Sequence, residues 1–124
     1  LEQLKGTSIK LFNANSQTFL YTLRHGAAGF SGIMGNFHPD LYAWVCDNYE
    51  KEPEKAERVQ GFLTLTAFLE ALAYPQTAKY HMNKVGVPMS LWSRSCDQKK
   101  FTKYQRMIID ELIQTENHVR EIIK

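Results

Sequence analysis

The segment from His25 to Pro39 holds the residues whose types and spacing could serve a ligand. Its middle part, Ala28–Ile33, is a run of small and apolar residues, which is typical of a strand buried on both faces of a parallel sheet. Gly29 and Gly32 would let the backbone approach a bound molecule closely. Because α/β folds place their chemistry at the carboxyl ends of parallel strands, the sequence predicts a binding edge where this run ends.

The sequence carries no motif for nucleophilic, nucleotide or metal chemistry. It contains no Ser-His-Asp order, phosphate-binding glycine loop or His-Glu-x-x-His pair. His25 and His38 flank the strand at opposite ends, so we expect no metal shared between them. Cys46 and Cys96 lie too far apart for a structural zinc site and favour a reducing compartment, which predicts a cytoplasmic protein with a free thiol at Cys46.

The composition is that of an ordinary globular chain. Of the 124 residues, 44% are hydrophobic and 23% are charged, and the net charge is +2. Lysine and arginine alternate with acidic residues, so we expect no nucleic-acid partner. No apolar run approaches the roughly 20 residues that a membrane helix needs, and the start, Leu1–Lys5, lacks the layout of a signal peptide. The sequence therefore predicts no membrane association.

Hydrophobic periodicity and turn residues predict two strands and five helices. The strands are expected over Ser8–Phe12 and Ala28–Ile33. The helices are expected over Thr18–His25, Pro39–Tyr49, Glu54–Ala73, Thr77–Val85 and Lys99–Ile123. Since a helix joins the two strands, they should pair in parallel.

The two expected strands raise a physical problem. A stable sheet normally needs three or more strands with a buried face, and this sequence supplies two. We therefore expect the chain to be the back part of a larger α/β protein, and the start at Leu1, without an initiator methionine, favours the same interpretation. The alternative is a small α+β domain whose sheet edges are covered by a partner chain.

Several segments follow one another in a distinctive order. They are Ile9–Ala14, Gly26–Gly32, Asn36, Pro39, Tyr74–Pro75, Lys79, Gly86 and Arg94. In this order they resemble the C-terminal part of the dihydrodipicolinate synthase / N-acetylneuraminate lyase family, and the resemblance spans nearly all of the chain.

The resemblance implies a fold and a division of the chain. The family has a (β/α)₈ TIM barrel followed by a small three-helix domain, and a complete barrel takes about 250 residues. Ile9–Phe12 and Phe30–Ile33 would be the seventh and eighth barrel strands. Residues 1–50 would form the last two β/α units of an α/β barrel, and residues 51–124 the helical C-terminal domain.

The resemblance also implies a reaction. Family members bind pyruvate or a related 2-oxo acid as a Schiff base on a lysine of the sixth strand, with a proton-relaying tyrosine on the fifth, and they need no cofactor or metal. Both strands would lie upstream of this sequence, so no catalytic residue is expected within it. A Schiff-base lysine needs a dry pocket that lowers its pKa, and Lys5, Lys10 and Lys79 are poor candidates for that role.

The family's substrate-contacting positions can be carried onto this sequence by aligning on Gly26. They fall at Ala14, Ser16, Ser31, Gly32 and Ile33, with solvent exposure the simpler interpretation for the neighbouring Gln17. Each position also has a structural alternative: Ser16 would cap a helix, and the small strand residues would fill the barrel interior.

Two functions follow as hypotheses. The first is a class I lyase or aldolase that joins pyruvate to an aldehyde acceptor or cleaves the product, in a homo-oligomer that the resemblance makes a tetramer. The second is a non-catalytic helical interaction module whose two strands dock onto a partner.

Overall fold

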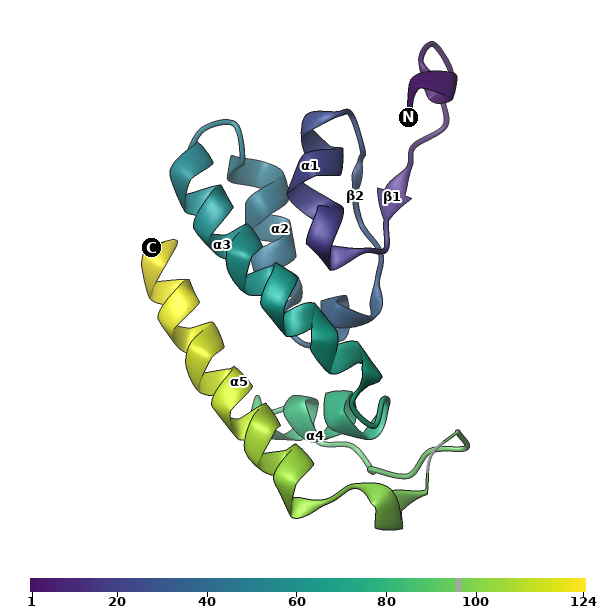
Figure 1. Ribbon diagram of the computed structural model, residues 1–124, viewed down its shortest axis with the longest axis vertical. Coiled ribbons are helices and arrows are strands. Elements are labelled where there is room, and N and C mark those ends of the chain that lie inside the picture. The colour runs from purple at the N-terminus through teal and green to yellow at the C-terminus, as the bar shows by residue number, and fades with distance from the viewer. Residues whose placement is uncertain (96) are drawn as a thin grey trace. The chain divides into compact units, whose positions relative to one another are not determined.

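The computed structural model describes residues 1–95 and 97–124 (Figure 1). The chain forms two compact units, Leu1–Ala67 and Phe68–Lys124. Cys96, the second cysteine of the sequence, lies outside the described residues.

The first unit contains a pair of short parallel strands. β1 is Phe12–Asn13 and β2 is Gly29–Phe30, with Phe12 opposite Gly29 and Asn13 opposite Phe30. The ladder continues on both sides, because the Ala28 amide donates to the Leu11 carbonyl at 2.7 Å and the Ser31 amide donates to the Asn13 carbonyl at 2.9 Å. The connection runs through α1 (Phe19–Arg24), so the predicted helical crossover and parallel pairing are confirmed (Figure 1).

The expected fold class is wrong. The part of the chain that the structure describes has five α-helices and a single sheet of two strands, and no portion of a TIM barrel is present. The strands are shorter than Ser8–Phe12 and Ala28–Ile33 because the ladder ends where Gly32 turns the chain into a 3₁₀ helix, Ile33–Asn36. Two strands of two residues each cannot form the curved wall of a barrel.

Prolines begin the two longer helices of the first unit. α2 spans Pro39–Asn48 and α3 spans Pro53–Thr66, each with proline in the first turn, where its missing N–H costs no hydrogen bond. The two helices pack on each other, and α3 also packs on α1. Apolar side chains that share this core are buried: Phe19, Leu20, Leu41, Val45, Val59 and Leu63.

A buried glutamine ties α3 to the residues around α1. The Gln60 side chain accepts a hydrogen bond from the Leu20 amide at 2.9 Å and donates one to the Ser16 carbonyl at 2.8 Å. Buried amides need such partners, so this pairing fixes the position of α3 within the unit. α3 therefore belongs to the first compact unit, which runs to Ala67.

The second unit pairs α4 (Gln76–Lys84) with α5 (Lys103–Ile122). Thr102 and Gln105 form a capping box at the start of α5, which satisfies two backbone amides that the helix leaves open. Gly86, with φ of 95°, follows the end of α4 and adopts a backbone conformation that favours glycine. The helix expected over Glu54–Ala73 divides here, because Ala67–Ala71 is a separate 3₁₀ segment.

His81 of α4 is buried, although the helical pattern of the sequence predicts a surface position. Its Nε2 lies 2.9 and 3.0 Å from the two carboxylate oxygens of Glu116 on α5, and both side chains are fully buried. His118, also expected at the surface, is exposed. A hydrogen-bonded histidine–carboxylate pair therefore joins the two helices of this unit.

Gly61 is the one glycine inside α3, and we expect its replacement by alanine to stabilise the protein. A Cβ at this position meets no atom within 4 Å, and the residue is exposed. Gly61→Ala should raise the free energy of unfolding by about 0.5–1 kcal/mol, because alanine loses less backbone entropy than glycine in a helix. Urea unfolding of both proteins measures the difference, and an unchanged or lower midpoint would show that this backbone is not helical in solution.

Candidate functional site

The carboxyl ends of β1 and β2 bring together four of the five expected site residues. Ala14 follows β1 directly, and Ser31 follows β2. Gly32 precedes the 3₁₀ helix in extended backbone, and Ile33 is the first residue of that helix. Because parallel strands end on the same side of their sheet, the two loops lie next to each other.

Gly32 brings the two loops into backbone contact. A Cβ on this residue would lie 2.6 Å from Cζ of Phe30 and closer still to the carbonyl oxygen of Ala14. Gly32 has φ of −138°, so its backbone is ordinary extended chain and the glycine is required by contact alone. Ala14 and the Ser31–Ile33 turn thus form one continuous surface.

The fifth expected residue, Ser16, points into the core. It is fully buried, and its Oγ lies 2.6 Å from the hydroxyl of Tyr42 on α2. Its carbonyl accepts from Gln60. The residues on either side, Asn15 and Gln17, are exposed, as expected for Gln17. Ser16 is held beneath the surface that the other four residues form.

Tyr42 on α2 contacts Ser16 after β1 and Phe30 of β2, and it is not among the residues that the sequence predicts for the site. Its ring stacks on Phe30 with centroids 3.8 Å apart and planes at 6°, and the Phe19 ring meets it edge-on at 5.2 Å. A sequence signal was present, because His38, Leu41, Tyr42 and Val45 recur at helical spacing. The pairing with Ser16, 26 residues away, carries no such signal.

Asparagine side chains organise the loop after β1. Asn13 Nδ2 donates to the hydroxyls of Thr18 at 3.0 Å and Thr22 at 2.9 Å. Asn15 Oδ1 accepts from the Thr18 amide at 2.9 Å and caps the 3₁₀ helix Ser16–Thr18, so the cap is Asn15 and not Ser16. The path of this loop is therefore fixed by side chains of its own sequence.

The edge is polar but uncharged. Apart from histidine, residues 11–23 and 26–39 contain no acidic or basic side chain. Among residues 1–95 and 97–124, no group of three or more His, Cys, Asp or Glu side chains could hold a metal ion. Hydroxyl, amide and backbone groups of this edge can bind and orient an oxygen-rich molecule, whereas proton transfer and nucleophilic attack need groups from elsewhere.

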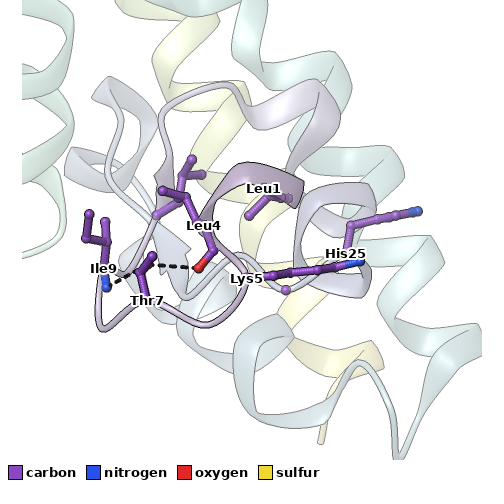
Figure 2. A pocket seen from close by; sticks show the side chains of 8 residues that line it. Leu1, Leu4, Lys5, Thr7, Ile9 and His25 are labelled. Carbon is purple, nitrogen blue, oxygen red and sulfur yellow. Dashed lines mark hydrogen bonds between the residues drawn. The ribbon is translucent and has the colours of Figure 1, made fainter.

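A hollow of about 310 Å³ lies at the other, amino end of the strands (Figure 2). It is lined by Leu1, Leu4, Lys5, Thr7, Ile9, Leu11, His25 and Gly26. Its polar groups do not converge. Lys5 Nζ pairs with Glu2 at 2.7 Å, and His25 Nδ1 lies 2.7 Å from the Tyr21 carbonyl while its ring points away from Leu4 and Ile9 (Figure 2). This hollow is separate from the expected site.

Cys46 on α2 is half-buried and free, and burial raises the pKa of its thiol, with the nearby Asp47 carboxylate adding to the rise. At pH 8 less thiolate is therefore present than in an unfolded chain, and thiolate is the species that reacts. In a Cys96→Ser background, we expect iodoacetamide to modify Cys46 several-fold more slowly in the native protein than in guanidinium. Asp47→Asn should speed the native reaction, and equal native and unfolded rates would contradict the burial of the thiol.

None of the helices in the described part of the chain combines the length and the apolar character needed to cross a membrane. Comparison with known protein families, with characterised proteins and with solved structures finds no match to this chain.

Proposed function

We propose that this chain supplies part of the substrate-binding edge of a class I lyase that forms a Schiff base with pyruvate. The observation that carries the proposal is the backbone contact between Gly32 and Ala14, which joins the two loops at the carboxyl ends of parallel strands. Ligands bind at this end of parallel strands in α/β proteins. The order of the segments from Ile9 to Arg94, with its resemblance to the pyruvate-dependent lyases, selects the reaction.

The proposed reaction divides between this chain and residues outside it. A lysine amine attacks the 2-oxo carbon of pyruvate, water leaves, and an imine forms; loss of a methyl proton then gives an enamine whose carbon attacks an aldehyde acceptor. Lys5 and Lys10 are exposed, which is the wrong environment for a Schiff-base amine. Lys79 donates to the Trp92 carbonyl. By the family resemblance, the reacting lysine and its proton-relaying tyrosine would lie in sequence outside this chain.

The remaining features of the proposal follow from the same resemblance. The protein would use pyruvate and an aldehyde without a metal or an organic cofactor, and it would work as a homo-oligomer, a tetramer by resemblance. The free thiol of Cys46 is compatible with a cytoplasmic location.

Borohydride trapping tests the lyase proposal. The protein that contains this chain is incubated with pyruvate and then reduced, which converts an imine to a stable secondary amine. We expect one reduced pyruvyl group per chain, and peptide mapping should place it on a lysine outside these 124 residues. A lactate control, which lacks the oxo group, should give no adduct. Absence of the adduct at saturating pyruvate would overturn the proposal.

A second candidate function rests on the exposed side of the sheet. Ile9 is 63% exposed and Phe12 is 54% exposed, so the segment around β1 leaves large apolar side chains uncovered. This favours a module whose strands dock onto another protein without catalysis. Such a module would be soluble and folded as the isolated chain, without a pyruvate adduct. Sedimentation and far-UV circular dichroism of residues 1–124, beside the trapping experiment, separate the two functions.

A further inference from the structure

Tyr42 on α2 contacts the loop after β1 at Ser16 and the end of β2 at Phe30. Its hydroxyl is 2.6 Å from Ser16 Oγ in the loop after β1. Its ring stacks on Phe30, the last residue of β2, at 3.8 Å. Phe30 in turn abuts Gly32, the residue that meets the Ala14 carbonyl. The Tyr42 ring therefore links the Ala14–Ser16 loop, through Ser16, to the Ser31–Ile33 turn, through Phe30.

We propose that Tyr42 is the positioning residue of the site, holding the Ala14–Ser16 loop and the Ser31–Ile33 turn in the geometry that receives the acceptor aldehyde. The inference rests on the proposed lyase function and concerns the same edge. Tyr42 does not touch the ligand, because only 4% of it is exposed. It acts through Ser16 and Phe30.

The hydrogen bond between Ser16 and Tyr42 is buried, so its loss would be costly. Ser16 is fully buried, so a hydroxyl that lost Tyr42 would have no water to replace it. The bond pulls Ser16 inward, and this orientation leaves its neighbours Asn15 and Gln17 on the outside. Asn13 and Asn15 hold the loop locally, whereas the bond to Tyr42 anchors it on α2. Losing that anchor displaces the loop that carries Ala14 by a small distance, and small displacements of a binding group have large effects on catalysis.

Tyr42→Phe tests the proposal because it removes the hydroxyl and keeps the ring that stacks on Phe30. The readouts are the pyruvate concentration that gives half-maximal borohydride trapping and the KM for glyceraldehyde in aldol addition. We expect the trapping curve to stay unchanged and the KM for glyceraldehyde to rise roughly tenfold. Tyr49→Phe is the matched control, since Tyr49 follows the same helix and its hydroxyl donates to the exposed Glu50.

A second variant separates positioning from a loss of folding. Ser16→Ala removes the same hydrogen bond from the other side. If the loss of that bond causes the rise in the KM for glyceraldehyde, the double variant Ser16→Ala, Tyr42→Phe should raise the KM no further than either single variant does. Amide hydrogen exchange of α2 and α3 reports whether each variant keeps its fold.

The outcomes distinguish the two proposals. A wild-type protein that traps pyruvate, with a KM for glyceraldehyde unchanged in both variants, would overturn the role of Tyr42 and leave the lyase function standing. An equal rise in Tyr49→Phe, or additive effects of the two substitutions, would also overturn it. A wild-type protein that traps no pyruvate would overturn the lyase function and with it the proposed role.

Discussion

Replacing Gly32 with alanine is expected to lower the free energy of unfolding by about 3 kcal/mol, the upper part of the range for forcing extra atoms into packed space. The new Cβ would lie 2.6 Å from Cζ of Phe30 and closer to the Ala14 carbonyl oxygen, which belongs to the backbone and cannot rotate away. Either β2 or the loop after β1 must move. The loss is measured by urea unfolding followed by circular dichroism.

Gly35→Ala is the matched control for this substitution. Gly35 lies in the same turn, and a Cβ there would meet Phe30 at 3.8 Å, an ordinary contact distance. We expect its effect to be well below that of Gly32→Ala, and we expect Gly32→Ala also to abolish turnover of glyceraldehyde. Equal stabilities of Gly32→Ala and Gly35→Ala would contradict the close backbone contact between Gly32 and Ala14.

His81→Leu is expected to lower the free energy of unfolding by about 3 kcal/mol, because it leaves the buried Glu116 carboxyl group without its hydrogen-bond partner. Glu116 would retain Arg120, whose Nη1 is 3.4 Å from Oε2, a weaker contact than the 2.9 and 3.0 Å approaches of His81. Amide hydrogen exchange should show the loss of protection concentrated in α4 and α5.

Two further variants test whether the stability lost in His81→Leu comes from the pairing with Glu116. His118→Leu, an exposed substitution on α5, should change stability little. A double variant with leucine at both 81 and 116 should recover much of the stability, since apolar residues often replace a buried pair without loss. If His81→Leu were as mild as His118→Leu, the two side chains would not be paired in solution.

Local signals in the sequence predicted where most elements begin. Pro39 and Pro53 begin helices, Gly26 and Gly86 follow helices, and a helix joins two parallel strands. These features depend on residues close in sequence, whose backbone preferences act regardless of the rest of the chain.

Features that depend on distant contacts could not be predicted. The expectation of a barrel is wrong because small apolar residues such as those of Ala28–Ile33 suit a buried strand but do not fix its length. The ladder ends where the chain turns into the 3₁₀ helix Ile33–Asn36. The hydrogen bonds between α3 and the residues around α1 depend on Gln60, and nothing near Gln60 in the sequence indicates its buried partners.

The candidate site shows the same distinction. Ala14, Ser31, Gly32 and Ile33 meet at one edge because they follow paired strands, which the sequence could indicate. Their role in binding stays a prediction. The inward position of Ser16 and the proposed positioning role of Tyr42 depend on the hydrogen bond between these two residues. They are 26 positions apart, so no local signal in the sequence indicates the bond. Likewise, the sequence pattern predicts His81 at the surface, and only the fold buries it against Glu116.

The most direct test of the account is a crystal structure of the protein after pyruvate treatment and borohydride reduction. The account predicts a reduced pyruvyl group on a lysine outside this chain, lying within hydrogen-bond distance of the edge formed by Ala14, Ser31 and Gly32. A pyruvyl group at the amino end of the strands, on Lys5 beside the hollow of Figure 2, would contradict it. So would a fully reduced sample that carries no adduct.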